Sequence, residues 1–179
     1  DWPTLRDNKD QEISRLNGIY ENMLVNAGVE VFKVRARVVD PHTVDVGGKM
    51  VTAKYILIAT GGWPSVPNIP GNEHAITSNE FFHMEKWPER AIVVGGGYIA
   101  VELSGVFNGL GVNVTQLYRG PHFLRGFDDD VRYHLADEMR KQELDLRFNA
   151  NIARIEKEGE VLVAVLEDGT QMRTDVILY

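Results

Sequence analysis

The hydrophobic positions of residues 4–27 recur every three or four residues, which is the spacing of one face of an α-helix. Gly28 then ends the periodic stretch. Residues 29–39 alternate in polarity and are rich in β-branched side chains, and two further short runs flank Gly47 and Gly48. A Gly-Gly pair between alternating runs favours a tight hairpin turn. The pattern therefore predicts one amphipathic helix followed by a small antiparallel meander.

A short apolar run at residues 55–59, "YILIA", ends in Thr60 and Gly61. An uninterrupted run of this length followed by glycine is typical of a buried strand in a parallel sheet. Residues 61–88 hold four of the seven prolines and show no sustained apolar period, so we interpret them as a junction between two domains.

The pattern after the junction predicts a strand at 91–94, a glycine-rich turn, a helix from about 98 to 110 and a strand at 112–117. This order is one βαβ unit. A helix at about 129–142 follows, and then come the strand-like "LDLRF", three antiparallel strands within 152–174, and a return to the parallel sheet at 176–179. We expect an α/β fold, a parallel sheet with an added antiparallel meander, and a domain boundary between residues 87 and 88.

Composition excludes several functional classes. A net charge of -7 leaves no general basic surface for nucleic acid, and the longest apolar stretch, residues 91–101, is well short of the ~20 residues of a membrane span. The chain has no cysteine, and its five histidines lack ligand spacing, so we expect neither a disulfide nor a metal site. We expect a soluble, cytoplasmic protein.

Gly95, Gly97 and Ala100 form a G-x-G-x-x-A pattern between the predicted strand and helix. In a dinucleotide site the first glycine permits the turn, the second lets a pyrophosphate approach the backbone, and the small third residue allows close packing of helix and strand. The alternative is a glycine-rich turn that serves packing only.

An NAD site places an acid about 20 residues beyond these glycines to bind the ribose 2′-hydroxyl. Here that count reaches Tyr118 and Arg119, and Arg125 follows one short loop later. Two guanidinium groups suit a 2′-phosphate, which a carboxylate would repel. The pattern therefore favours NADP(H), although both arginines could also be ordinary solvated loop charges.

The blocks "LNGIYENML", "ILIATGGWP", "ITSNEFF", "VVGGGYIAVELSG" and "YRGPHFLRGFD" resemble, in this order, the pyridine nucleotide-disulfide oxidoreductases, and among them the glutathione reductases of bacterial type. The resemblance covers essentially the whole chain. It implies that residues 1–87 are the C-terminal part of an FAD-binding domain with its linker, and that residues 88–179 are most of an NADPH-binding domain. It also implies a homodimer whose interface domain lies outside this chain.

The resemblance assigns site residues by position. Gly96, Ile99 and Glu102 correspond to NADPH contacts, and Tyr98 to a ring that covers the nicotinamide pocket of the flavin. The alternative interpretation, without the resemblance, is that Tyr98 is a packed aromatic residue and that Glu102 is an acidic residue on the solvent-facing side of the helix.

The same resemblance places Ala36 beside the flavin adenine and Thr60 and Gly61 at a strand end that passes the flavin, where the alternative is plain strand and turn structure. Tyr20 corresponds to a tyrosine that lies along the substrate, glutathione disulfide. Met23, however, is the residue found at the corresponding position of the related trypanothione enzyme. Trypanothione-, mercuric- and lipoamide-type reductases, or a stand-alone NADP-binding module, therefore remain alternatives. Because the family uses a cysteine pair and this chain has none, we expect the chain alone to bind NADP(H) without reducing disulfides.

Overall fold

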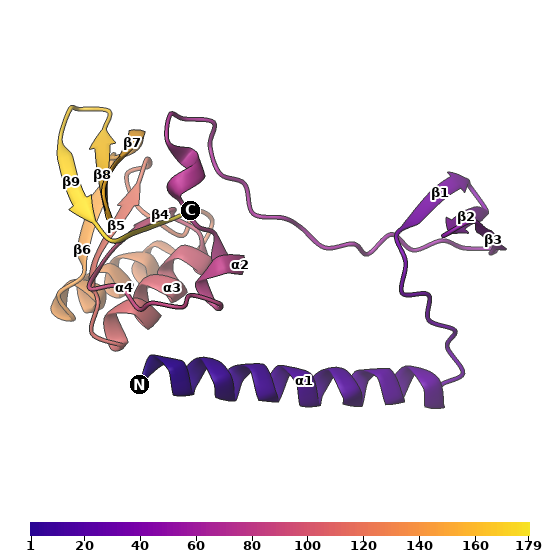
Figure 1. The fold of residues 1–179 in the computed structure, drawn as a ribbon. Coiled ribbons are helices and arrows are strands. Elements are labelled where there is room, and N and C mark those ends of the chain that lie inside the picture. The colour runs from indigo at the N-terminus through magenta and orange to yellow at the C-terminus, as the bar shows by residue number, and fades with distance from the viewer. The chain divides into compact units, whose positions relative to one another are not determined.

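A computed structural model describes all residues, 1–179, and divides them into two compact units, Asp1–Trp63 and Pro64–Tyr179 (Figure 1). The sequence pattern predicted a boundary between residues 87 and 88 instead.

The first unit opens with helix α1, Trp2–Asn26. Asp1 caps it by accepting a hydrogen bond from the backbone N–H of Thr4 at 3.2 Å, and Gly28 follows with a positive φ of 71°. The expected helix is therefore present. None of its residues is buried, however, so its apolar side chains have no core to pack against within this unit.

The predicted meander is also present, as strands β1 (Ala36–Asp40), β2 (Thr43–Val46) and β3 (Lys49–Thr52), paired antiparallel in that order. Gly47 and Gly48 both have positive φ, 70° and 94°, as a primed two-residue turn requires. The first strand is shorter than expected, because residues 29–35 are not strand.

Residues 55–59 do not form the buried strand that their apolar run predicts. Leu57 is 89% exposed, and no other strand of the chain pairs with this segment. A parallel strand exists only where neighbouring strands supply hydrogen-bond partners. An apolar run indicates that a segment can be buried in a sheet. It does not indicate whether neighbouring strands are present to pair with it.

The second unit contains the predicted βαβ unit and its additions. Its elements in order are η1 (Asn72–His74), α2 (Ser78–Phe81), β4 (Arg90–Val94), α3 (Tyr98–Gly109), β5 (Asn113–Tyr118), α4 (Asp129–Lys141), β6 (Asp145–Phe148), β7 (Ile152–Glu158), β8 (Val161–Leu166), β9 (Gln171–Thr174) and β10 (Val176–Leu178). A parallel sheet has the order β10-β4-β5-β6, and an antiparallel sheet has the order β7-β8-β9. The expected α/β fold class is confirmed.

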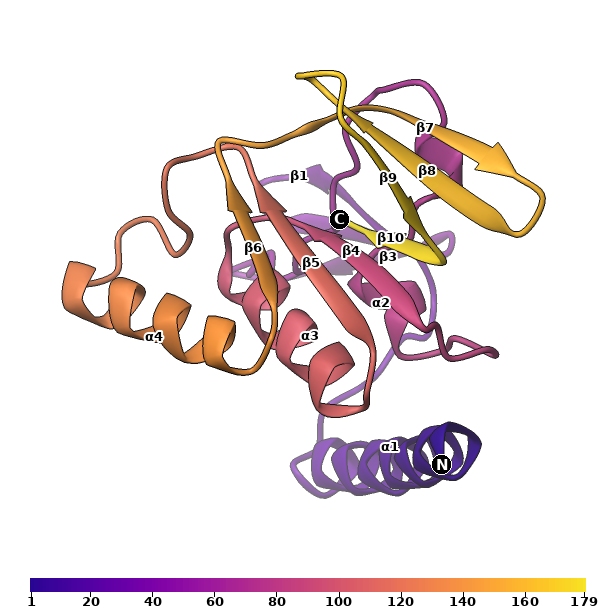
Figure 2. The same ribbon diagram turned by 90° about the vertical axis from the view of Figure 1, so that its left-hand side faces the viewer.

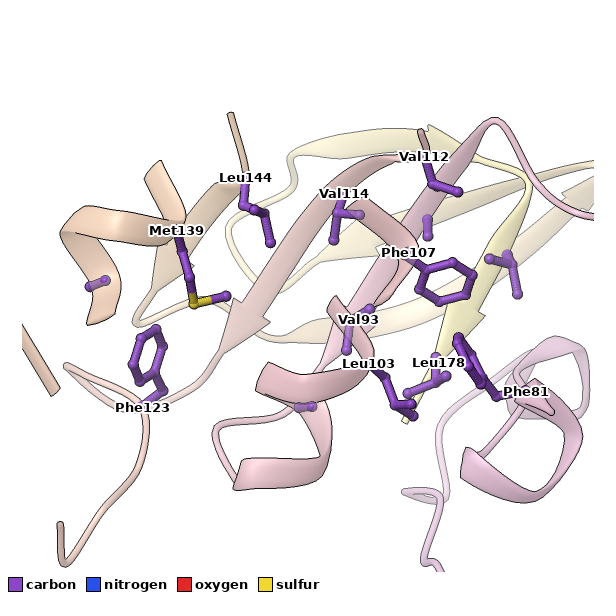
Figure 3. Close-up of a cluster of buried hydrophobic side chains, with 14 of the residues drawn as sticks. Phe81, Val93, Leu103, Phe107, Val112, Val114, Phe123, Met139, Leu144 and Leu178 are labelled. Atoms are coloured by element: carbon purple, nitrogen blue, oxygen red, sulfur yellow. The ribbon is translucent and has the colours of Figure 1, made fainter. Parts of the chain in front are cut away.

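This unit has three layers. Helices α3 and α4 cover one face of the parallel sheet, and the antiparallel sheet covers the other (Figure 2). In β4, Val93 belongs to the core on the helix side, whereas Ile92 belongs to the core on the side of the antiparallel sheet. Because both faces are covered, the strand is apolar at successive positions. Figure 3 shows the helix-side core, where the rings of Phe81 and Phe107 pack edge to face. Their centroids are 4.8 Å apart.

Residues 64–87 pack on the rest of the second unit, which explains why the boundary lies before them. The backbone of Ile76 pairs with that of β10, donating to the carbonyl of Ile177 at 2.8 Å. A capping box was overlooked in the sequence: the hydroxyl oxygen of Thr77 accepts from the N–H of Asn79, and Glu80 accepts from the N–H of Thr77. This box starts α2, so the segment is more than a junction.

Across all fifteen elements, the structure contains no helix with the length and apolar character of a membrane span.

Candidate functional site

The glycine-rich turn connects the end of β4 to the start of α3. The N–H of Gly95 donates to the carbonyl of Leu117 at 2.9 Å, and the side-chain amide of the buried Gln116 donates to the carbonyl of Gly95 at 3.0 Å. Gly95 has a φ of 154°, and a β-carbon added there would lie 3.1 Å from that of Ala100. The turn is thus tied to β5 and needs small residues at both positions.

Helix α3 begins with free backbone donors. Gly97 is its N-cap residue and supplies no side-chain hydrogen bond, and a β-carbon added there would meet no atom within 4 Å. The first N–H groups of a helix without a side-chain cap can bind an anion, with the helix dipole in favour of negative charge. A phosphate can therefore approach this end closely.

The ring of Tyr118 lies between two glycines. A β-carbon on Gly96 would come within 2.5 Å of the ring, and one on Gly120 within 2.6 Å. Tyr118 is the residue that ends β5, where an NAD site would carry its acid. The ring therefore joins the glycine turn to the loop that follows β5.

A pocket of about 620 Å³ opens at this place. Its lining residues are Gly96, Gly97, Tyr98, Tyr118, Arg119, Gly120, Pro121, Leu124, Arg125 and Phe127. No carboxylate is among them. The glycine turn and both candidate arginines thus face one cavity.

Arg119 and Arg125 are exposed and have no carboxylate partner. Every other arginine of the second unit forms an ion pair: Arg90, Arg132, Arg140, Arg147, Arg154 and Arg173. The two arginines of this unit without an ion-pair partner are therefore the two that line the pocket.

The remaining predicted residues lie in different places. Ile99 and Glu102 are exposed on α3 but do not line the pocket, and Ala100 is buried behind the turn. Tyr98 lines the pocket and is 60% exposed.

The predicted flavin and substrate residues belong to the first unit. Ala36 begins β1, and Thr60 and Gly61 follow the irregular run 55–59, with Gly61 at a φ of 72°. Tyr20 is 58% exposed on α1. Within the first unit these residues are all exposed, and their roles remain predictions.

The sequence analysis missed the packing roles of Tyr118 and Gly120 and the part played by Leu124 and Phe127 in the lining. A tyrosine at the end of β5, directly before Arg119 and Gly120, was the available signal.

Residues 2–179 match the family model described as pyridine nucleotide-disulphide oxidoreductase. The chain belongs to this family.

Glutathione reductase from Burkholderia cepacia is 44% identical over 177 residues, which are 99% of this chain and 39% of that protein. The chloroplastic/mitochondrial glutathione reductase of Pisum sativum is 49% identical over 129 residues, 72% of this chain and 23% of that protein. Among solved structures, the HOCl-induced flavoprotein disulfide reductase RclA from Escherichia coli superposes with a TM-score of 0.86 at 27% identity, covering 97% of this chain and 41% of that one. The chain thus spans about two fifths of the length of the proteins from B. cepacia and E. coli.

Proposed function

We propose that residues 64–179 bind NADP(H). The N-terminus of α3, with Gly96 and Gly97, would hold the pyrophosphate, and Arg119 and Arg125 would hold the 2′-phosphate of the adenosine. The observation that carries the proposal is the pocket itself. It brings the glycine turn together with two unpaired guanidinium groups and contains no carboxylate.

The charges of the pocket favour a phosphorylated ligand. A guanidinium in an ion pair must break its bond to the carboxylate before it can bind a phosphate. Arg119 and Arg125 have no such ion pair to break. A charge-assisted, bidentate bond between guanidinium and phosphate is stronger than a neutral one. A ribose hydroxyl offers no charge to these groups, so NADH gains little from them.

The pocket residues fit the dinucleotide in shape as well. The open space at Gly97 admits a phosphate to the backbone, and the ring of Tyr118 keeps the turn and the arginine loop at a fixed separation. Tyr98, at the first position of α3, extends from the same cavity into solvent, where we place it beside the nicotinamide half.

Isothermal titration of the chain with NADPH and with NADH tests the proposal. We expect NADPH to bind at least tenfold more tightly at moderate ionic strength, about 1.4 kcal/mol or more. Equal affinities, or no NADPH binding by the folded chain, would overturn it.

For the whole protein, we propose an NADPH-dependent FAD flavoprotein that reduces glutathione disulfide and acts as a homodimer in the cytoplasm. The relatives from B. cepacia and P. sativum, both named glutathione reductase, support this assignment. In such an enzyme NADPH supplies a hydride and the flavin relays its electrons to a disulfide. The part that this chain performs is to hold the nicotinamide cofactor. Ile99, Glu102 and the first-unit residues Ala36, Thr60, Gly61 and Tyr20 keep their roles as predictions.

A further inference from the structure

The loop that carries both arginines has its buried side chains at its centre. It connects β5 to α4, and Arg119 and Arg125 are exposed near its two ends. Between them Phe123 is fully buried and Leu124 is 6% exposed. Figure 3 shows Phe123 next to Met139 of α4, within the helix-side core. The positions of the arginines therefore depend on how this buried centre is held.

Leu124 has a backbone conformation that its side chain disfavours. Its φ is 54°, in the left-handed region, where residues other than glycine are uncommon. Its N–H donates to the carbonyl of Gly96 at 2.6 Å. The strained residue thus directly precedes Arg125 and binds the loop to the glycine turn. Because leucine does not favour this left-handed conformation, contacts with other residues must stabilise it.

Arg132 of α4 bonds to the loop just before this residue. Its Nε donates to the carbonyl of Phe123 at 2.8 Å and its Nη2 to the carbonyl of His122 at 3.2 Å. The side chain is only 16% exposed, and Asp129 pairs with the remaining nitrogen. A planar guanidinium can serve two successive carbonyls at once, which an ammonium cannot do with the same geometry. Arg132 is therefore bonded to the two residues that precede the strained position.

We propose that Arg132 is a positioning residue that sets the preference for a phosphorylated dinucleotide. By fixing the carbonyls of His122 and Phe123, it holds Leu124 in its left-handed conformation against Gly96 and keeps Arg125 on the pocket. This inference rests on the NADP(H) binding proposed above. Arg132 does not line the pocket and reaches the ligand only through the loop.

The proposal requires a selective effect. Without Arg132 the loop relaxes and Arg125 leaves the 2′-phosphate, while the glycine turn still receives the pyrophosphate. The affinity for NADPH then falls and the affinity for NADH changes little. A residue that only stabilised the fold would lower both affinities together.

The test is Arg132→Ala in the full chain, compared with Arg154→Ala, which removes the same charge from an exposed ion pair with Glu156 on β7. We expect Arg132→Ala to raise the Kd for NADPH at least tenfold and the Kd for NADH less than threefold, and Arg154→Ala to change neither by more than about twofold. Asp129→Asn removes the ion pair but keeps both carbonyl bonds, and we expect it to retain most of the preference.

Hydrogen exchange of the ligand-free chain gives a second readout that involves no cofactor. We expect the amide of Leu124 to exchange at least tenfold faster in Arg132→Ala and at its original rate in Arg154→Ala, because its bond to Gly96 depends on the carbonyls that Arg132 holds.

A wild-type chain without preference for NADPH would overturn the proposed function. A wild-type preference that Arg132→Ala leaves unchanged, or an unchanged exchange rate at Leu124, would overturn this inference alone. Should Arg132→Ala fail to fold, Arg132→Lys decides the question: a reduced NADPH preference supports the inference, and an unaltered preference contradicts it.

Discussion

The ring of Tyr118 lies so close to Gly96 that a β-carbon on that glycine would come within 2.5 Å of its Cδ2 atom. Real β-carbon contacts are never this short, so the ring and the turn must separate if the glycine is replaced. The ring can lie this close to the glycine turn only because residue 96 has no β-carbon.

Gly96→Ala should consequently lose both stability and binding. We expect overpacking to lower the free energy of unfolding by about 1 to 3 kcal/mol, and the displaced turn to weaken NADPH binding. Urea denaturation and calorimetric titration measure the two effects. For stability, Gly97→Ala is the matched control, because a β-carbon there meets no atom within 4 Å. A Gly96→Ala chain as stable as the Gly97→Ala chain would show that the ring is not confined.

Replacing Arg119 and Arg125 by alanine tests their role in recognition. Each charge-assisted bond contributes roughly 1.5 to 3 kcal/mol, so each single substitution should raise the Kd for NADPH by about tenfold or more. The Kd for NADH should change by less than about threefold, because its neutral ribose 2′-hydroxyl forms no charge-assisted bond with either arginine. Titration of each variant with both cofactors measures this. An equal fall in NADH affinity would mean that the pair serves the structure of the loop.

Gly71 provides a test of the fold outside the site. Its φ is 80°, and a β-carbon added to it would lie 1.9 Å from the carbonyl oxygen of Ile155 in β7. We expect Gly71→Ala to lower the free energy of unfolding by roughly 2 to 4 kcal/mol, through backbone strain and the clash together.

Gly169→Ala is the control for Gly71, because its φ is also positive at 87° but nothing lies within 4 Å of the added carbon. It should cost only about 1 kcal/mol, the price of the left-handed conformation alone. If urea denaturation gave the two variants equal stability, the close approach of residues 64–87 to β7 would be in doubt.

The stability of the second unit should fall in acid through Asp175. This carboxylate accepts from Nη2 of Arg90 at 2.6 Å and from the N–H groups of Arg90 and Glu89 at 2.9 and 3.1 Å. The hydrogen bond from the Arg90 side chain, with the backbone bonds, holds the pKa of Asp175 below its ordinary value. Its contribution is therefore complete above the unfolded pKa of about 3.9 and is lost as pH falls through the folded pKa.

Asp175→Asn should remove this dependence. We expect the wild type to be the more stable at pH 7, and the difference between the two chains to shrink as the pH falls below about 4. Urea denaturation at a series of pH values measures it. A difference that stayed constant down to the most acidic values would show that the carboxylate is not stabilised by its bonds.

Much of the second unit could be predicted from the sequence because its signals are local. Alternation and β-branched runs predicted the strands, and Gly95 with Gly97 predicted the turn between β4 and α3. The apolar run at residues 176–179 predicted a return to the parallel sheet, and the structure shows that β10 pairs there with β4. These features depend on residues near one another in the chain.

What failed depended on partners elsewhere. Residues 55–59 suit a sheet, but no strand of this chain pairs with them. For the site, position predicted that Arg119 and Arg125 follow β5, whereas their lack of ion-pair partners is a property of the fold. The bonds from Arg132 go to backbone carbonyls, which every residue possesses, so no sequence pattern could have indicated them.

A crystal structure of the chain with bound NADPH tests the central claim most directly. We expect the 2′-phosphate within hydrogen-bond distance of the guanidinium groups of Arg119 and Arg125, with the pyrophosphate at the N-terminus of α3. A structure with the 2′-phosphate in another place and both side chains directed into solvent would contradict the account.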